Sequence, residues 1–245
     1  MTYFWTNKIS PGFYDMALDA GIKSGNSVQA MWHHTTFSFV SKYIKNNQLI
    51  LDYACGPATL TGKYLSLDSN PICTDISSSQ LNYARKIYPN KAEYLNLEEF
   101  KFENYKNQFD VVTCLGLLEF LSFEEGELLL KNIYSILKPD GRLLITTPNF
   151  KMSMKVIEAL LNSIGDLNYS NEYKSRYKLS QLLKLVEKSN FKSVASKKYM
   201  TAGIFMGIFS NKLAINLNRL IESLSRNNWG YLIFLELKKW KKNYL

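Results

Sequence analysis

The sequence predicts a doubly wound α/β fold, in which helices cover both faces of a largely parallel sheet. From residue 49 onward, short apolar runs alternate with stretches of helical periodicity, as in repeated strand–helix units. The first apolar run ends in a loop of small residues, and such sheets bind ligands where their strands end. We expect a single domain over residues 1–245, with a helical cap (1–48), a ligand-binding core (49–150) and a substrate-side region (151–245).

Five strands are expected in the core and two more close the sheet. Each is a short apolar run bounded by polar or turn-forming residues. The core strands are expected at residues 49–53, 71–75, 93–97, 109–115 and 142–147, and the closing strands at 191–200 and 230–237. An insertion, residues 201–229, separates the last two strands and is expected to be helical in its second half.

Helical periodicity occupies the stretches around these strands. It is found at residues 27–45, 80–88, 126–138, 179–186 and 213–224. Ser77 to Ser79 can cap the second of these helices, and Ser122 with Glu125 has the spacing of a capping box before the third. Pro139 and Gly141 are expected to end the third helix and turn the chain into the next strand.

Composition and charge limit the class of protein. Hydrophobic residues make up 46% of the chain and charged residues 21%, which suits a globular protein with a sizeable core. No stretch approaches the roughly 18 apolar residues of a membrane span. The three cysteines, Cys55, Cys73 and Cys114, are odd in number and lack metal-ligand spacing, so we expect reduced thiols and a cytoplasmic location.

The net charge of +9 is concentrated in the last third of the chain. Residues 151–245 hold 17 basic against 6 acidic residues, an excess of +11. A lysine-rich solvated surface is the commoner reason for such an excess. The alternative is a surface that binds nucleic acid, an anionic membrane or an acidic substrate.

The loop after the first strand, DYACGPAT at residues 52–59, is poorly made for a dinucleotide. The G-x-G-x-x-G pattern that admits a pyrophosphate would fall on Ala54, Gly56 and Thr59, so two of its three glycines are absent. Pro57 also removes a backbone N–H group that a phosphate would use. The loop can admit a ligand near Gly56, but that ligand is not expected to carry phosphate.

Two aspartates indicate what the ligand is instead. Asp75 ends the second strand 23 residues after Asp52, a spacing at which an acid can accept hydrogen bonds from both hydroxyls of a ribose. Asp52 would repel a pyrophosphate but suits an ammonium group or another cationic centre. Together they favour a ligand made of adenosine and an amino acid.

Five segments in order resemble the motifs of class I S-adenosylmethionine-dependent methyltransferases, over roughly residues 45–150. They are ILDYACGPATLTGKYL, PICTDISSSQLNYAR, AEYLNLEEFKF, FDVVTCLGLLEFL and ILKPDGRLLITTPNF. The resemblance implies S-adenosyl-L-methionine as cofactor and a Rossmann-like seven-stranded sheet whose last strand is antiparallel. Asn96 would meet the adenine amino group and Leu97 would line its ring. The implied cofactor-binding residues are Asp52, Ala54, Cys55, Gly56, Pro57, Asp75, Ile76, Gln80, Asn96, Leu97, Leu115 and Leu117.

Two departures from the family pattern matter. Ala54 and Ala58 replace the first and third loop glycines, so the backbone there is expected to be compatible with a Cβ atom. The similar quinone-pathway O-methyltransferases carry an acid-x-x-acid-His cluster after the fourth strand. Gly116, Glu119 and Phe120 stand at those positions here, so no metal is predicted.

No residue stands out as the catalytic group, because methyl transfer relies mainly on alignment and exclusion of water. His33 and His34 are the only histidines and are weak candidates for a base. The alternative is that His33 packs partly into the core while His34 is solvated. Tyr169, Tyr173 and Tyr177 either bind substrate or pack along one face of a helix, and Glu119 either orients its loop or is structural.

We expect methyl transfer to a metabolite that is either small or linked to a lipid or saccharide, with oxygen as the accepting atom. The alternatives are an RNA or protein methyltransferase, motivated by the basic last third, and a non-catalytic nucleoside-binding module; a nicotinamide oxidoreductase fits least. The apolar part of insertion 201–229 is either a lid over an apolar acceptor or an element packed onto the sheet. The basic end, residues 238–245, either contacts an anionic membrane surface or is frayed.

Overall fold

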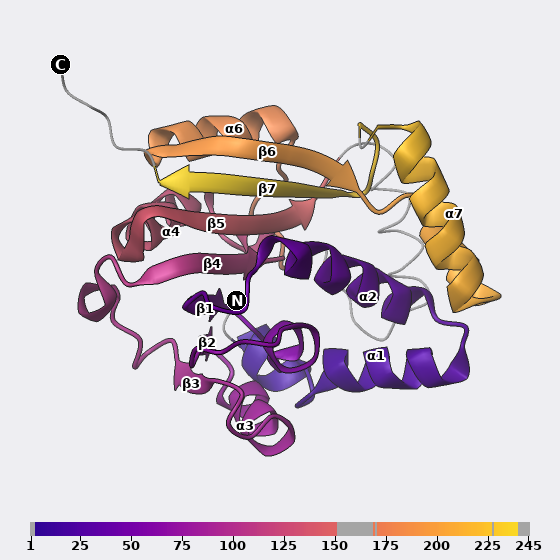
Figure 1. The fold of residues 1–245 in the computed structure, drawn as a ribbon, viewed down its shortest axis with the longest axis horizontal. Helices are drawn as coiled ribbons and strands as arrows, with labels where there is room; N and C mark the ends of the chain where they lie inside the picture. The colour runs from indigo at the N-terminus through magenta and orange to yellow at the C-terminus, as the bar shows by residue number, and fades with distance from the viewer. Residues whose placement is uncertain (1–2, 151–168, 170, 227, 240–245) are drawn as a thin grey trace.

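A seven-stranded sheet forms the centre of the computed structural model, which describes residues 3–150, 169, 171–226 and 228–239 (Figure 1). The strand order is β3-β2-β1-β4-β5-β7-β6. The strands are β1 (Ile50–Tyr53), β2 (Ile72–Asp75), β3 (Glu93–Asn96), β4 (Phe109–Leu115), β5 (Leu137–Pro148), β6 (Phe191–Tyr199) and β7 (Leu232–Lys239). All neighbouring pairs are parallel except those of β7, which runs antiparallel to β5 and β6. The predicted Rossmann-like sheet with an antiparallel last strand is therefore confirmed.

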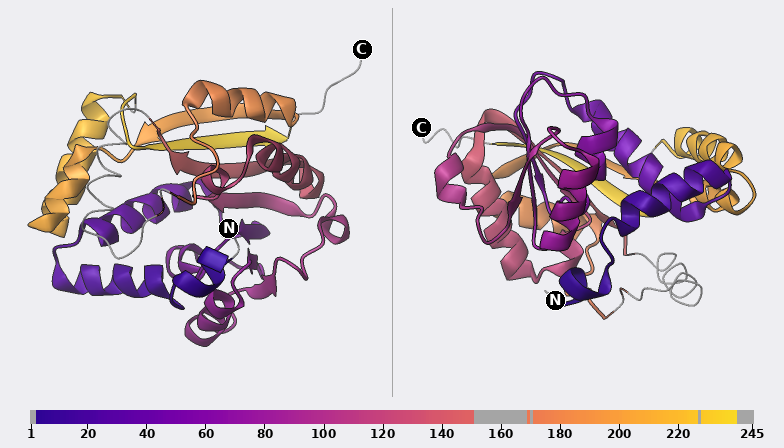
Figure 2. Two further views of the ribbon diagram at one scale, coloured as in Figure 1. Left: turned by 180° about the vertical axis from the view of Figure 1, so that it is seen from behind. Right: turned by 90° about the horizontal axis from the view of Figure 1, so that it is seen from below.

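Helices lie on both faces of this sheet, as expected (Figure 2). They are α1 (Phe13–Ser24), α2 (Val28–Val40), α3 (Ser78–Ile87), α4 (Phe123–Ile136), α6 (Leu179–Lys188) and α7 (Asn211–Leu224). Successive strand residues point to opposite faces, so Leu51 joins a core with α4 and α6 while Ile50 joins another with α2. Burial on both faces explains why these strands are continuously apolar rather than alternating.

Local signals located some helix ends well and others badly. The capping box before α4 is present: Glu125 N donates to Ser122 Oγ at 3.1 Å, and Ser122 N donates to the Glu125 carboxylate at 2.7 Å. The predicted turn at Pro139 and Gly141 is present, since Asp140 has a φ of +68° and Gly141 lies against the Lys138 backbone, but α4 already ends at Ile136 and the turn falls inside β5, which begins at Leu137. The register between β4 and β5 shifts here, because Phe109 pairs with Leu137 and Val111 with Arg142, so residues 138–141 of β5 bulge out of the pairing.

The insertion before β7 packs beside α2 rather than over the sheet. Its apolar first half is a short 3-10 helix (Ala202–Ile208) and its second half is α7, and both contact α2. Predicted helix 27–45 is shorter than expected, because α2 ends at Val40 and continues as a 3-10 turn. In the part of the chain that the structure describes, no helix has the length and apolar character required to cross a bilayer.

Candidate active site

A cavity of about 640 Å³ lies where β1, β2, β4 and β5 end. The residues that end these strands, Tyr53, Asp75, Leu115 and Pro148, line it. This is the edge at which doubly wound sheets bind ligands. Aromatic side chains from distant parts of the chain complete the wall: Trp5, Tyr14, Trp32, Phe120, Tyr169 and Tyr173.

Nearly all of the residues predicted to bind cofactor line this cavity. They are Asp52, Ala54, Cys55, Gly56, Pro57, Asp75, Ile76, Gln80, Leu97, Leu115 and Leu117. Asn96 does not. Its amide nitrogen donates to Ile76 O at 3.2 Å and to Ser78 Oγ at 2.9 Å, and its Oδ1 accepts from Glu98 N. The expected contact of Asn96 with adenine therefore differs from the structure, in which this side chain braces the turn between β2 and α3.

The loop after β1 adopts a conformation that favours glycine even where alanine stands. Ala54, Gly56 and Ala58 have φ angles of +59°, +55° and +55°. The expectation that the backbone at Ala54 and Ala58 suits a Cβ atom is therefore wrong, because left-handed φ angles strain an L-residue. The turn after β1 requires left-handed backbone angles at these positions, so the two alanines adopt them despite the strain.

Replacing Ala54 with glycine is expected to raise the free energy of unfolding by about 0.5–1 kcal/mol, since the left-handed strain exceeds the entropy added to the unfolded chain. Urea denaturation measures the change. Ala20, exposed within helix α1, is the matched control, and Ala20→Gly should lower stability by up to about 1 kcal/mol. A loss of stability in both variants would contradict the strain at Ala54.

The two predicted aspartates are buried and differently held. The Asp75 carboxylate accepts hydrogen bonds from the backbone N–H groups of Gly56 and Ser77, both at 2.8 Å. The Asp52 carboxylate accepts from the hydroxyls of Thr113 at 2.7 Å and Thr61 at 3.0 Å. Burial raises the pKa of both carboxyls, against the lowering effect of these hydrogen bonds.

These residues fit an adenosine joined to an amino acid. A Cβ atom added to Gly56 would meet nothing within 4 Å, so the space beside the Asp75 carboxylate is open. Ile76 and Leu97 give the same region apolar walls of the kind that a flat base requires. Each Asp52 oxygen accepts a hydrogen bond from one threonine hydroxyl and retains a lone pair for a cationic group.

Gln80 lines the cavity, and its amide is already occupied. It donates to Ser10 O at 2.9 Å and accepts from Gly12 N at 2.9 Å. The side chain thus ties the amino-terminal segment to α3, and its predicted role in cofactor binding is limited to lining.

The two histidines have different environments. His33 lines the cavity, and its ring lies 5.3 Å from that of Tyr14 and 6.0 Å from that of Phe37. Desolvation lowers the pKa of His33 to about 4, which leaves it neutral and weakly basic. His34 lies outside the lining, where its Nδ1 and the Tyr64 hydroxyl are 2.9 Å apart. His33 is therefore a poor general base near neutral pH, and the pKa of His34 is likewise lowered, by burial and by the positive charge of Arg219.

Glu119 is the stronger acid–base candidate. Its side chain is buried and lines the cavity, and one carboxylate oxygen accepts from the Thr147 hydroxyl at 3.0 Å. Burial raises the pKa of this carboxyl to about 7. Its backbone oxygen accepts from the N–H groups of Lys174 and Ser175, which anchors the loop. In the described residues, no three His, Cys, Asp or Glu side chains gather in a way that would hold a metal ion.

Sequence reasoning missed most of the aromatic wall. Trp5 lies 4.7 Å from Phe120 between ring centroids, and the hydroxyls of Tyr14 and Tyr169 are 2.8 Å apart. None of the described residues of insertion 201–229 lines the cavity, whereas Trp5, Tyr14 and Trp32 of the amino-terminal cap do. The spacing of Tyr169, Tyr173 and Tyr177 reflects no helix, because residues 171–178 are turns and extended chain; only the first two tyrosines line the cavity.

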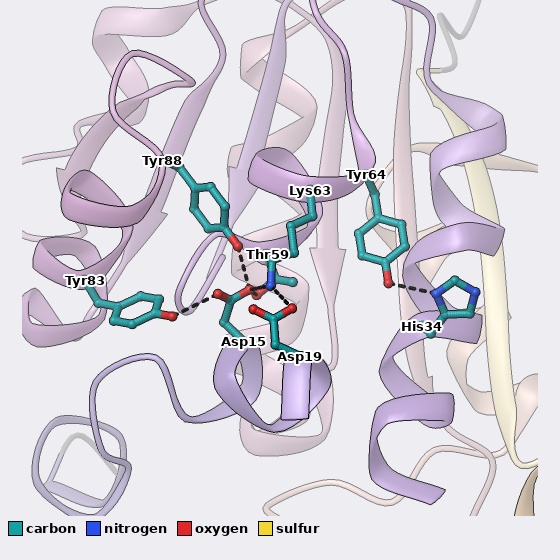
Figure 3. A network of polar contacts seen from close by, with 8 residues as sticks. All are labelled: Asp15, Asp19, His34, Thr59, Lys63, Tyr64, Tyr83 and Tyr88. Atoms are coloured by element: carbon teal, nitrogen blue, oxygen red, sulfur yellow. Dashed lines mark hydrogen bonds and ion pairs between the residues drawn. The ribbon is translucent and has the colours of Figure 1, made fainter. Parts of the chain in front are cut away.

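A buried polar network fastens this cap to the cofactor loop (Figure 3). The carboxylate of Asp15, on α1, accepts from the hydroxyls of Tyr88 at 2.6 Å, Tyr83 at 2.9 Å and Thr59 at 2.9 Å. Lys63 pairs with the same carboxylate at 3.0 Å. Since Thr59 belongs to the loop DYACGPAT, α1 and the loop are joined through one buried acid.

Replacing Asp15 with alanine is expected to lower the free energy of unfolding by about 3 kcal/mol, because it leaves buried hydroxyls and an ammonium group without their acceptor. Urea denaturation gives the value. Asp19, which is mostly exposed and also pairs with Lys63, supplies the control, and Asp19→Ala should cost no more than about 1 kcal/mol. Equal losses in the two variants would refute a special role for the buried acid.

Comparison with known proteins agrees with this site. Residues 50–141 match the family model of a methyltransferase domain. The ubiquinone/menaquinone biosynthesis C-methyltransferases UbiE of Citrobacter koseri and Pseudoalteromonas translucida are each 30% identical, over 143 and 167 residues. The matches cover 54% and 60% of this chain and 53% and 64% of those relatives, so the chain matches only part of their length.

Solved structures show the same fold. The magnesium protoporphyrin IX methyltransferase of Synechocystis with bound S-adenosylhomocysteine superposes with a TM-score of 0.59 at 15% identity, covering 87% of this chain and 85% of that one. The [4+2]-cyclase SpnF gives 0.57 at 15% identity, covering 84% and 80%. Because one of these is named as a cyclase, fold alone does not determine the reaction.

Proposed function

Residues 50–141 form a class I S-adenosylmethionine-dependent methyltransferase domain, and from this premise we propose that the chain methylates a small hydroxylated aromatic acceptor. The main support for this proposal is one observation. A single cavity holds the residues suited to the cofactor, an aromatic wall and a buried carboxyl with a pKa of about 7.

The cofactor's requirements correspond to named side chains. Asp75 would hold the ribose hydroxyls, Asp52 the amino group, and Ile76 and Leu97 the adenine. When bound, S-adenosylmethionine supplies an electrophilic methyl group on its sulfonium. The chain itself contributes the enclosure, since the largely apolar wall excludes water and restricts how an acceptor lies.

We propose Glu119 as the group that accepts a proton from the acceptor hydroxyl. Its carboxyl reaches the cavity while Thr147 orients it, and its raised pKa balances ionisation against basicity near pH 7. Loss of the hydroxyl proton makes a phenol a better nucleophile at its oxygen and at its ring carbons. The same base would thus serve either accepting atom.

Aromatic acceptors suit the wall, and oxygen is the accepting atom that we propose. Trp5, Trp32, Phe120 and Tyr173 line the cavity and give an aromatic ring other rings to pack against. A ring carbon is the second candidate, because the relatives at 30% identity are named as C-methyltransferases of quinone biosynthesis. A lipid chain on the acceptor is compatible with the apolar lining.

Methyl transfer from ¹³C-methyl-labelled S-adenosylmethionine to a panel of phenols and hydroquinones tests the proposal. We expect labelled products, and their carbon shifts distinguish methyl ethers from ring methyl groups. Glu119→Gln is the control for chemistry that depends on this site. Cofactor binding without turnover on any acceptor would contradict the proposal and favour a non-catalytic nucleoside-binding module.

A further inference from the structure

The outer side of helix α7 carries an exposed row of leucines. Leu213, Leu220 and Leu224 are 45%, 55% and 75% exposed. Their spacings of seven and four residues place them on one face of the helix. Ala214 and Asn218, on another side of the helix, are buried, so α7 packs through that side while the leucine row stays exposed.

Neighbouring segments extend this row into a surface. Ile208 and Phe209, just before α7, are 63% and 73% exposed, and Ile22 of α1 is half exposed. Asn211 holds these parts together, since its N–H donates to Gly25 O and its amide to Gly21 O, each at 2.7 Å. Figure 1 shows α7 at the margin of the molecule, beside α1 and α2. We call this the α7 surface: Ile22, Ile208, Phe209, Leu213, Leu220 and Leu224.

The charge that borders the α7 surface is positive. Lys212 and Arg219 are exposed and seven residues apart, so they form a row parallel to the leucines, and Arg226 follows the helix. Glu222 is the only acidic residue in α7, and its carboxylate is used internally by Met200 N at 2.8 Å and by Asn218 Nδ2 at 3.0 Å. An apolar row beside a cationic row is the pattern of helices that lie in a lipid interface.

We propose that the α7 surface docks on an anionic lipid bilayer, with α7 parallel to the membrane plane. Leu220 and Leu224 would enter the boundary between headgroups and acyl chains, while Lys212 and Arg219 would lie at the lipid phosphates. A second copy of this chain is a poorer occupant, because a two-fold contact would bring the same cations together. The proposal does not depend on the proposed reaction.

Sedimentation with vesicles tests the proposal on the full chain. We expect the protein to bind vesicles of phosphatidylcholine with phosphatidylglycerol and to stay in solution with phosphatidylcholine alone. Lys212→Gln/Arg219→Gln should weaken partitioning by about 30-fold. Leu220→Ser/Leu224→Ser should weaken it by about tenfold or more. The control Lys86→Gln/Lys91→Gln removes the same charge near α3 and should bind as the parent does.

Three outcomes would overturn the proposal: a parent protein that ignores anionic vesicles, a control pair that loses as much binding as the α7 pair, or a dimer that Leu220→Ser/Leu224→Ser dissociates. The last would assign the α7 surface to a second copy. Calorimetry with S-adenosylhomocysteine on the same variants should match the parent, which separates failure of docking from failure of the proposed function.

Discussion

Replacing Glu119 with glutamine is expected to slow methyl transfer by about 10²–10⁴-fold, because an amide cannot accept the acceptor's proton. Glutamine keeps the shape and can still accept from the Thr147 hydroxyl. Single-turnover assays with saturating cofactor measure the chemical step. Glu127→Gln, at a partly exposed position on α4 where Glu127 pairs with Lys131, is the control and should react as the parent does.

The pH dependence separates this role from a structural one. The parent's rate should rise with pH through about 7, as the Glu119 carboxyl ionises, and the variant should lack that rise. Stability should move oppositely: the folded carboxyl keeps its proton to higher pH than the unfolded one, so stability declines from about pH 4.5 to 7. Above that range Glu119→Gln should be more stable than the parent by up to roughly 3 kcal/mol. An unchanged rate, or an unchanged pH profile, would exclude Glu119 as the base.

Replacing Asp75 with alanine is expected to weaken cofactor binding by about 100-fold or more, since two hydrogen bonds to a charged acceptor would be lost. The Asp75 carboxylate also holds Gly56 N and Ser77 N, so alanine loosens the loop as well. Asp75→Asn keeps one acceptor and should weaken binding by about tenfold. Tryptophan fluorescence reports the titration, because Trp5 and Trp32 line the cavity.

Asp68→Ala removes the same charge at an exposed position and serves as the control, for which parent-like affinity is expected. Parent-like affinity in both Asp75 variants would remove Asp75 from the cofactor site. A loss in Asp75→Ala alone would assign the residue to the loop rather than to the ligand.

Features that depend on neighbouring residues were predictable from the sequence. The apolar run ending in Asp52, the second run ending in Asp75 and the capping box of Ser122 and Glu125 are local patterns, and all three lie as expected. Local reasoning failed where distant segments meet. Pairing of Leu137 with Phe109 makes β5 begin before the turn at Pro139 and Gly141, whereas the local pattern placed the start of the strand after that turn.

The cavity wall was less predictable for the same reason. Tyr14 and Tyr169 form one hydrogen bond across 155 positions, and no periodicity signals such a contact. Asn96 has the residue type for an adenine contact, but its amide nitrogen donates to the nearby Ser78 hydroxyl. The raised pKa of Glu119 likewise arises from burial, which residue type alone does not give.

Calorimetric titration of the parent protein, with S-adenosylhomocysteine and then separately with NAD⁺, tests most directly whether DYACGPAT is a loop for a phosphate-free nucleoside. We predict saturable binding of S-adenosylhomocysteine at one site per chain and no heat from NAD⁺. Binding of NAD⁺, or no binding of S-adenosylhomocysteine, would contradict the assignment of this cavity to methyl transfer.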